Sequence, residues 1–225
     1  MPELLSVNIA VPKVVDYTDA EFTGIDKRPI DTMVKIVAPG PQGTADSGLA
    51  GDRIGDKRFH GGDHQAVYAY AREDLDHWER ELGKPLANGS FGENFTVAGL
   101  DVNGALVGER WRVGPDVLLE VTSPRIPCRT FQEWLEEPGW VKRFTQAARP
   151  GAYLRVVRPG EVRAGDQVTV EHRPEHEVTV ALVLRALSGE PELLPRVLAA
   201  GEALNPEHAA SVRKRLERRA VARDA

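Results

Sequence analysis

Residues 153–170 read YLRVVRPGEVRAGDQVTV, a stretch in which strand-forming and turn-forming residues alternate. Two runs rich in β-branched residues, Tyr153–Val157 and Val168–Val170, are separated by the turn-forming segments Pro159-Gly160 and Ala164-Gly165-Asp166. β-branched and aromatic residues favour strands, whereas Gly, Pro and Asp favour turns. The stretch therefore predicts short strands joined by turns.

The same alternation runs through the first three quarters of the chain. The other predicted strands are Leu4–Val11, Met33–Val37, Ala66–Tyr70, Asn94–Val97, Trp111–Val113 and Val117–Val121. The turn signals between strands include Pro39-Gly40-Pro41, Gly61-Gly62 and Asn103-Gly104. Many short strands at such spacing are typical of a β-barrel or a β-sandwich.

Two helical segments are expected to interrupt the strands. Arg72–Leu82 places its apolar residues near one face, and Gly83 is suited to end that helix in a left-handed conformation. A second helical region, Thr130–Ala148, is broken at Pro138-Gly139. The predicted fold class is mainly β with added helices, an α+β protein.

After His176 the apolar residues repeat about every 3.6 residues instead of every two, which is typical of helices. Three helices are expected there: Val180–Leu187 with Thr179 as its cap, Glu190–Ala200, and a last helix that begins at Pro206 after the cap Asn205. Val212, Leu216 and Ala220 form an apolar stripe on the last helix. We divide the chain into a β-rich domain, residues 1–176, and a three-helix domain, residues 177–225.

The composition is that of an ordinary soluble protein. The 225 residues are 41% hydrophobic and 28% charged, with a mean hydropathy of -0.35 and a net charge of -5. A negative net charge argues against a general nucleic-acid binder, which needs a basic face. Residues 206–225 carry six basic against three acidic residues, and the solvated face of a terminal helix explains them more simply than nucleic-acid contact.

Cysteine usage and the N-terminus indicate a cytoplasmic protein. One cysteine excludes an intrachain disulfide, and the first five residues lack the features of a secretory signal. The longest apolar run, Val180–Leu184, is far shorter than the roughly 20 residues that span a bilayer. We expect neither a membrane nor a nucleic acid as a partner.

The single thiol, Cys128, lies in the segment TSPRIPCRT at residues 122–130. A thiolate is a nucleophile or a metal ligand, and Arg125 and Arg129 would favour this form if they lie close to it. The two prolines of the segment place Cys128 on a rigid loop after the strand that ends at Val121. Two interpretations stay open here: a reactive thiol, or a small hydrophobic residue that fills a gap in the core.

A second candidate segment, FHGGDHQAV, occupies residues 59–67. His60 and His64 have the i, i+4 spacing of zinc proteases, but the intervening glycines disfavour a helix and the expected glutamate is missing. A dedicated zinc site is therefore not predicted. Gly61 and Gly62 can instead turn N–H groups toward an anion; a plain turn between strands is the alternative.

Several segments together carry a family resemblance. In order, they are TGIDKRP (23–29), GLAGDR (48–53), HGG (60–62) with AVYAY (66–70), FGENF (91–95), PRIPC (124–128) and GAYLRV (151–156), followed by Gly160 and AGD (164–166). These blocks resemble the MOSC domain, the family named for the C-terminal domain of molybdenum-cofactor sulfurase. Within it the chain looks most like stand-alone bacterial proteins associated with resistance to N-hydroxylated purines, which also end in three helices.

The resemblance implies a MOSC-type β-barrel that binds the molybdenum cofactor (molybdopterin), with Cys128 as the protein ligand of the metal and the catalytic residue. Pyridoxal phosphate is not expected. Thiolate is a soft ligand suited to a transition metal, and the cofactor's phosphate needs N–H and cationic partners. The residues assigned to the cofactor are Lys27, Arg53, His60, Gly61, Gly62, Asn94, Ser123 and Arg125.

The implied activity is the reduction of an N-hydroxylated small molecule, such as 6-hydroxylaminopurine, from R–NHOH to R–NH2. This reaction consumes two electrons and two protons and releases water. Because an ordinary iron–sulfur cluster takes four cysteines and the chain has one, a separate electron-donor protein is expected. The stripe on the last helix fits docking of that donor, internal packing or a homodimer.

Two alternatives come from other functional classes. The protein could carry sulfur as a persulfide on Cys128, or carry the molybdenum cofactor to another enzyme. A non-catalytic barrel that binds a phosphorylated small molecule is the third interpretation.

Overall fold

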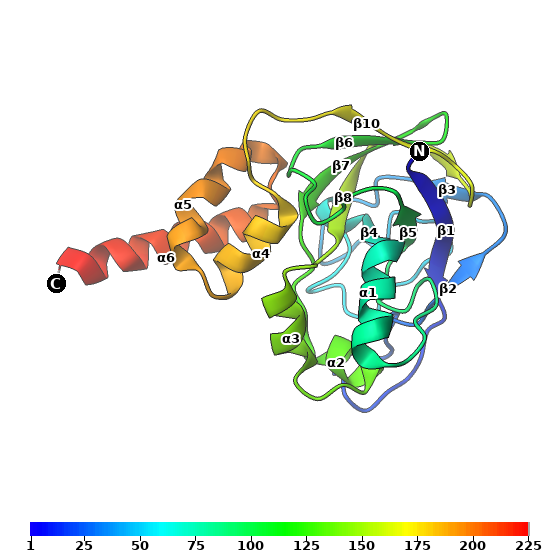
Figure 1. Cartoon of the computed structure of the whole chain (residues 1–225), viewed down its shortest axis with the longest axis horizontal. Helices are drawn as coiled ribbons and strands as arrows, with labels where there is room; N and C mark the ends of the chain where they lie inside the picture. Colours follow the sequence, from blue (N-terminus) through cyan, green and yellow to red (C-terminus); the bar gives the residue numbers. More distant parts are fainter. Residues whose placement is uncertain (225) are drawn as a thin grey trace.

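The computed structural model describes residues 1–224, and its main element is a mixed sheet of eight strands in the order β10-β6-β7-β8-β4-β5-β1-β2 (Figure 1). These strands are β1 (Glu3–Ala10), β2 (Lys27–Ile30), β4 (Val67–Ala71), β5 (Phe95–Ala98), β6 (Arg110–Val113), β7 (Val117–Ser123), β8 (Ala152–Arg158) and β10 (Val168–His172). β3 (Val34–Ile36) and β9 (Gly160–Val162) form a second, two-stranded sheet. β4 and β5 run parallel, and the other neighbouring strands run antiparallel.

The large sheet curls back on itself. Leu4 N–H donates to the carbonyl of Asp166 at 2.8 Å, and Leu4 O accepts from Gly165 N–H at 2.9 Å. Val168 N–H donates to the carbonyl of Pro2 at 3.0 Å. These bonds join the start of β1 to the chain around the start of β10, although the two strands are not neighbours in the sheet order. The predicted α+β class, built on a barrel-like sheet, is confirmed.

All eight predicted strands are present, with ends that differ by only a few residues. β2 and β9 were not predicted. β2 reads KRPI and lies at one end of the sheet order, where a proline is tolerated because its outer edge needs no N–H donor. β9 has three residues and pairs only with β3 in its sheet. Neither shows an apolar alternation, so pairing with a partner strand, and not local sequence, makes them strands.

Helices α1 (Arg72–Leu82), α2 (Arg129–Leu135) and α3 (Trp140–Ala147) enclose an aromatic cluster against one side of the sheet. Its largest members are Tyr68, Tyr70, Trp78, Phe91, Phe131, Trp140 and Phe144. Gly83 ends α1 with a φ of 66°, as predicted, and the chain breaks between α2 and α3 at Pro138-Gly139, also as predicted.

The C-terminal segment contains α4 (Val180–Ser188), α5 (Leu194–Val197) and α6 (Pro206–Asp224), with 3₁₀ turns η2 (Pro191–Leu193) and η3 (Leu198–Ala203). Thr179 Oγ1 accepts a bond from Leu182 N–H at 3.0 Å, and Asn205 Oδ1 accepts one from Glu207 N–H at 2.9 Å. Both predicted caps are therefore present. The single helix predicted for residues 190–200 is wrong: this stretch is divided among η2, α5 and η3. Pro195 has no N–H to continue a longer helix through it.

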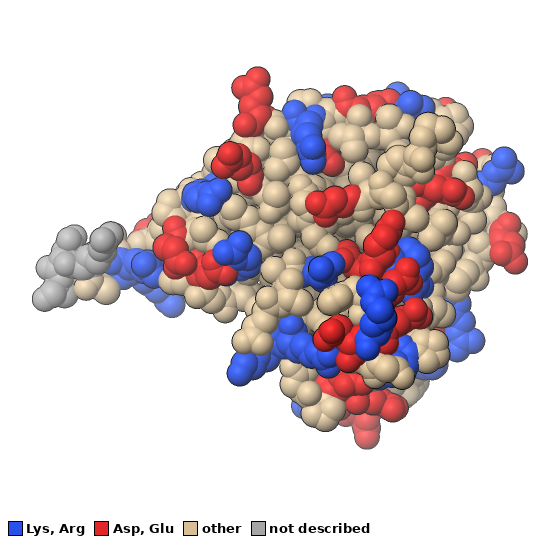
Figure 2. Space-filling model, in the orientation of Figure 1, with Lys and Arg blue, Asp and Glu red and all other residues tan. Residues whose placement is uncertain are grey.

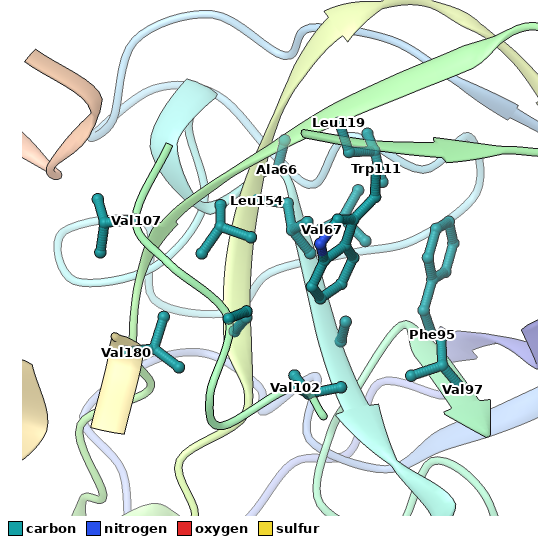
Figure 3. Close-up of a cluster of buried hydrophobic side chains, with 14 of the residues drawn as sticks. Ala66, Val67, Phe95, Val97, Val102, Val107, Trp111, Leu119, Leu154 and Val180 are labelled. Carbon is teal, nitrogen blue, oxygen red and sulfur yellow. The ribbon is translucent and has the colours of Figure 1, made fainter. Parts of the chain in front are cut away.

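The C-terminal helices share one hydrophobic core with the sheet. Val107 N–H donates to Val178 O at 2.9 Å and Val180 N–H to Ala105 O at 3.0 Å, and Figure 3 shows Val180 beside Val107. The core cluster extends from the strands through α4 to Val212 of α6.

Beyond this core, α6 projects away from the rest of the molecule (Figure 1). Leu216 still packs partly against the core, but Ala220, the third residue of the predicted stripe, is exposed. On the face drawn in Figure 2, acidic and basic side chains are interspersed. No helix within residues 1–224 combines the length and apolarity needed to cross a bilayer.

Candidate functional site

A cavity of about 480 Å³ opens where the chain segments after β1, before β4 and after β7 meet the start of α6. The structure brings most of the predicted site residues to its wall: Cys128, Lys27, Arg53, His60, Gly61, Asn94 and Arg125 line it. Gly62 and Ser123 do not line it. Segments far apart in the sequence therefore meet at one concave surface.

Two glycines allow part of this wall to form. A methyl group at Gly55 would overlap the carbonyl oxygen of Phe22, and one at Gly24 would overlap the carbonyl oxygen of Arg53. Any side chain would push apart the segments around residues 22–24 and 53–55. Neither position has a left-handed φ, so backbone conformation is not the reason for a glycine. Glycine is required here because the two backbones approach too closely for a side chain.

Cys128 is a half-buried free thiol, the residue directly before α2. It contacts the aromatic cluster on one side and lines the cavity on the other. The neighbouring Arg125 is buried; its Nη1 donates to Phe91 O, and its Cζ lies 4.1 Å from the ring centre of Phe131. Cys128 therefore packs against the core and also forms part of the cavity wall, so a ligand in the cavity would lie next to this residue.

Arg125 also supplies a fixed positive charge next to Cys128. Burial by itself would lower the pKa of Arg125, but interaction with Tyr153, Tyr68 and Cys128 raises it. The guanidinium is therefore charged at any ordinary pH. A thiolate or another anion in this part of the cavity would be stabilised by it.

Lys27 is paired with an acid that the sequence analysis did not select. Its Nζ lies 2.6 Å from both carboxylate oxygens of Asp52. Burial lowers the pKa of Lys27, and Asp52 opposes that shift. An ammonium has three protons, so Lys27 can still donate to a ligand, but much of its charge is neutralised by Asp52.

Asn94 belongs to the same network. Its Nδ2 donates to Asp52 Oδ2 at 2.8 Å, and its Oδ1 accepts from Tyr68 N–H at 3.1 Å. Asp52 Oδ1 also accepts from Ala10 N–H at 2.8 Å. Asn94 thus ties Asp52 to β4 while it lines the cavity, and both ends of its amide are engaged within the protein.

His60 and Arg53 differ in charge. Burial, followed by the charge of Arg125, lowers the pKa of His60 to about 4, so its imidazole is neutral at pH 7. It offers one hydrogen-bond donor and one acceptor to the cavity, but no charge. Arg53 is exposed at the rim, with its Cζ 5.2 Å from the ring centre of Phe22.

Gly62 supports the loop and not the cavity. Its N–H donates to Asp46 O at 3.3 Å, and a Cβ there would lie 2.6 Å from the backbone nitrogen of Gln42. The predicted role of Gly62, an N–H that donates to a bound anion, therefore does not fit this geometry.

Ser123 is fully buried at the end of β7 and does not line the cavity. Among the described residues, no group of three or more His, Cys, Asp and Glu side chains could hold a metal ion.

The cavity also contains residues that the sequence analysis did not select. They include Asp52, Phe59, Gln65, Tyr68, Tyr153 and His208. Asp52, Tyr68 and Tyr153 lie in the family-like blocks, so selection of the polar residues in those blocks would have found them. His208 lies on α6, outside every block, and nothing in its local sequence marks it.

Comparisons with known proteins identify the family and the fold of the chain. The family model of the MOSC domain matches residues 56–169. Protein YflK of Bacillus subtilis is 31% identical over 183 residues, which cover 81% of this chain and 79% of YflK. A protein of Gibberella moniliformis named "Reductase" is 30% identical over 152 residues, or 66% of this chain but 27% of that longer protein. The crystal structure of YiiM from Geobacillus stearothermophilus has a TM-score of 0.77 and 24% identity, covering 96% of this chain and 100% of that one.

Proposed function

Because the chain belongs to the MOSC domain family, we propose that it is a molybdenum-cofactor-dependent reductase of N-hydroxylated small molecules such as 6-hydroxylaminopurine. The observation that carries this proposal is the position of Cys128, a free cysteine in the wall of a cavity of about 480 Å³, which the buried cation Arg125 also lines. The name "Reductase" of a relative supports the reaction class.

The residues of the cavity fit such a cofactor. Cys128 is the one thiol that the chain offers, and a molybdenum–pterin group brings the remaining sulfur ligands itself. Lys27, Arg53 and Arg125 can donate to its phosphate and pterin oxygens, and His60 can bond to a neutral polar edge. When bound, the cofactor supplies the two-electron chemistry of N–O reduction, which the side chains of this protein cannot perform.

The protein's own share of the reaction is binding and orientation. Arg125 keeps a permanent charge at the thiol, and Tyr68 and Tyr153, whose pKa values are raised by burial, remain protonated. The partly apolar wall, with Phe59, Ile126 and Tyr153, suits a flat base. The electrons are proposed to come from a separate donor protein, because the chain has no set of cysteines for a cluster.

The test is molybdenum content followed by turnover. Protein purified from a host that makes the cofactor should contain about one molybdenum per chain, and Cys128→Ser should lose it. The loaded protein should convert 6-hydroxylaminopurine to adenine with a chemical electron donor. Full metal loading without any N–O reduction would contradict the proposed reaction and leave the cofactor assignment intact.

The carrier alternative makes a different prediction for the same thiol. A sulfur carrier would lack stoichiometric molybdenum and would release a labile sulfur from Cys128 on reduction. A carrier of the molybdenum cofactor would contain the metal but transfer it to an acceptor enzyme without reducing any substrate. A barrel that only binds a phosphorylated molecule would keep its ligand affinity in Cys128→Ser.

A further inference from the structure

Tyr153 carries a hydroxyl that bonds to nothing in the described chain, unlike the hydroxyls of its two neighbours. The hydroxyl of Tyr68 donates to Pro150 O at 2.8 Å, and that of Tyr70 donates to Arg149 O at 2.9 Å. The Tyr153 hydroxyl makes no hydrogen bond within residues 1–224, and it is not among the unpartnered atoms there that are closed off from solvent. Water or a ligand can therefore reach it.

The sheet holds the ring of Tyr153 in the cavity wall. In β8, Tyr153 pairs with Tyr68 of β4 and with Ser123 of β7. The ring centres of Tyr153 and Tyr68 lie 4.9 Å apart, and the Tyr153 carbonyl accepts from the hydroxyl of Thr122 at 3.1 Å. The residue is half-buried and lines the cavity. Because its ring and backbone are engaged, the hydroxyl is the part of Tyr153 that is left for a ligand in the cavity.

This hydroxyl shares one corner of the cavity with Arg125 and Cys128. The ring of Tyr68 contacts Tyr153, and the Cζ of Arg125 lies 5.2 Å from the centre of the same ring. Tyr153, Arg125 and Cys128 all line the cavity. Burial raises the pKa of Tyr153; the charge of Arg125 opposes this rise and Cys128 adds to it. The phenol is therefore protonated at pH 7 and can donate a hydrogen bond.

A phenol hydroxyl differs from the cations of the wall because it both donates and accepts a hydrogen bond. An N–OH group does the same, since its oxygen accepts and its proton is donated. The amine that the proposed reaction produces has no such oxygen. The oxygen to be removed must also come close to Cys128, the residue proposed to hold the metal, and Tyr153 has a free hydroxyl in that corner.

We propose that Tyr153 is a specificity-determining residue, whose hydroxyl binds the oxygen of the substrate's N–OH group beside Arg125 and Cys128. The inference rests on the proposed function and names the residue that distinguishes an N-hydroxylated substrate from its amine product. A ligand without that oxygen leaves the hydroxyl without its partner, so the amine binds more weakly. Because the hydroxyl is open to the cavity, water can replace the lost partner, which keeps the difference in affinity moderate.

The test uses full-length Tyr153→Phe, which removes the hydroxyl and keeps the ring that packs on Tyr68. Tyr17→Phe is the matched control, because Tyr17 is also half-buried but does not line the cavity. Calorimetry without an electron donor measures the affinity for 6-hydroxylaminopurine and for adenine, which differ by one oxygen atom. Pterin and molybdenum per chain are measured on the same preparations.

Wild-type protein and Tyr17→Phe should bind 6-hydroxylaminopurine about five- to tenfold more tightly than adenine, as expected for one hydrogen bond between neutral groups. Tyr153→Phe should lose this preference through weaker binding of 6-hydroxylaminopurine, with adenine affinity and cofactor content unchanged. A preference that survives in Tyr153→Phe overturns the proposal, as does a wild-type protein without the preference. Loss of pterin or molybdenum in Tyr153→Phe overturns it too, because the hydroxyl would then serve the cofactor.

Thermal unfolding separates recognition from structural support. Tyr70→Phe removes a hydroxyl that donates to the backbone and also accepts from Trp78 Nε1 at 3.0 Å, so the Tm of this variant should fall. Tyr153→Phe removes a hydroxyl without a partner in the chain and should keep the wild-type Tm. A fall in Tm as large as that of Tyr70→Phe would show that the hydroxyl supports the fold, and would overturn the proposal.

Kinetic measurements distinguish a failure of this inference from a failure of the reductase assignment. In a protein that reduces 6-hydroxylaminopurine, Tyr153→Phe should lower kcat/KM at least several-fold. An unchanged kcat/KM removes the role of Tyr153 and keeps the reaction. A preference that depends on Tyr153, in a protein without N–O reduction, keeps the role of Tyr153 in binding and removes the reaction.

Discussion

Asp52 accepts hydrogen bonds from three groups at once: the ammonium of Lys27, the amide of Asn94 and the backbone N–H of Ala10. It is nearly fully buried, and so is the ammonium that it pairs with. Removing one partner of a buried ion pair is strongly destabilising, because the remaining charge stays buried in an environment that solvates it poorly. This network joins β1, β2 and the chain before β5 at the cavity.

Asp52→Asn is therefore expected to lower the free energy of unfolding by about 3–5 kcal/mol, because Lys27 loses its counter-charge. Urea denaturation measures the change. Asp76→Asn is the control: Asp76 pairs with Arg72 on the exposed side of α1, and loss of that pair should cost less than about 1 kcal/mol. Equal, small losses in the two variants would show that the Lys27–Asp52 pair does not stabilise the fold.

The two neutral histidines of the cavity predict a loss of stability in acid. The pKa of His60 and of His208 is about 4 in the folded protein, against 6.5 in the unfolded chain. Between these values the unfolded chain binds more protons, so the free energy of unfolding should fall as the pH is lowered from 7 to 4. Because both rings are partly exposed, we expect about 1–3 kcal/mol for each histidine.

His208→Leu should remove its part of this pH dependence, whereas His172→Leu, at an exposed histidine, should keep the wild-type slope. Urea denaturation at several pH values between 7 and 4 is the measurement. A wild-type slope in His208→Leu would mean that His208 is not buried in its neutral form.

At the scale of elements, local signals account for most helix ends. Thr179 and Asn205 cap α4 and α6 through their side chains, and Gly83 ends α1 with a left-handed φ. These features depend on a few consecutive residues. The crossing of the segments around Gly24 and Gly55 is different, because it depends on the space between two backbones that are distant in sequence.

Gly55→Ala is expected to destabilise the protein by about 2–3 kcal/mol and to weaken ligand binding, since the methyl group must displace the Phe22 carbonyl. Gly83→Ala provides the comparison. Position 83 needs a glycine only for its φ of 66° and has open space around it. Gly83→Ala should therefore lower the free energy of unfolding by about 1 kcal/mol, with no effect on ligand binding. A Gly55→Ala variant as stable as Gly83→Ala would disprove the close crossing.

At the scale of the whole molecule, the core is continuous from the sheet to the C-terminal helices. Val178 and Val180 bond to the backbone of residues 105–107, and their side chains are buried. A chain that ends at His176 would expose this apolar surface to water. The division into residues 1–176 and 177–225 remains a proposal about chain organisation, and calorimetry can test whether the two parts unfold separately.

We expect the full chain to unfold in one transition, with a calorimetric enthalpy equal to the van't Hoff enthalpy, because the shared core couples the two parts. Two separated transitions would show that the helices fold independently of the sheet.

Docking of an electron donor is better tested by charge changes on the exposed half of α6, such as Arg215→Glu or Arg218→Glu, than by truncation, because truncation would expose the shared core.

Much of the candidate site follows from sequence blocks, and the rest required the structure. Cys128, Arg125 and His60 lie in recognisable segments, and the fold brings them to one cavity. Gly62 and Ser123 lie in or next to such segments but do not line the cavity. The N–H of Gly62 donates to the carbonyl of Asp46, and Ser123 is fully buried. Membership of a block predicts proximity to a site, but not which groups remain free to bind a ligand.

Most strands and helices, the helix caps, the family and the single thiol follow from the sequence alone, because each of these depends on residues close together in the chain or on composition. The pairing of Lys27 with Asp52 and the formation of strands β2 and β9 became visible only in the folded structure. Such pairing depends on distances between atoms of segments that are remote in the sequence. Folding sets those distances, and the local pattern of residue types does not contain them.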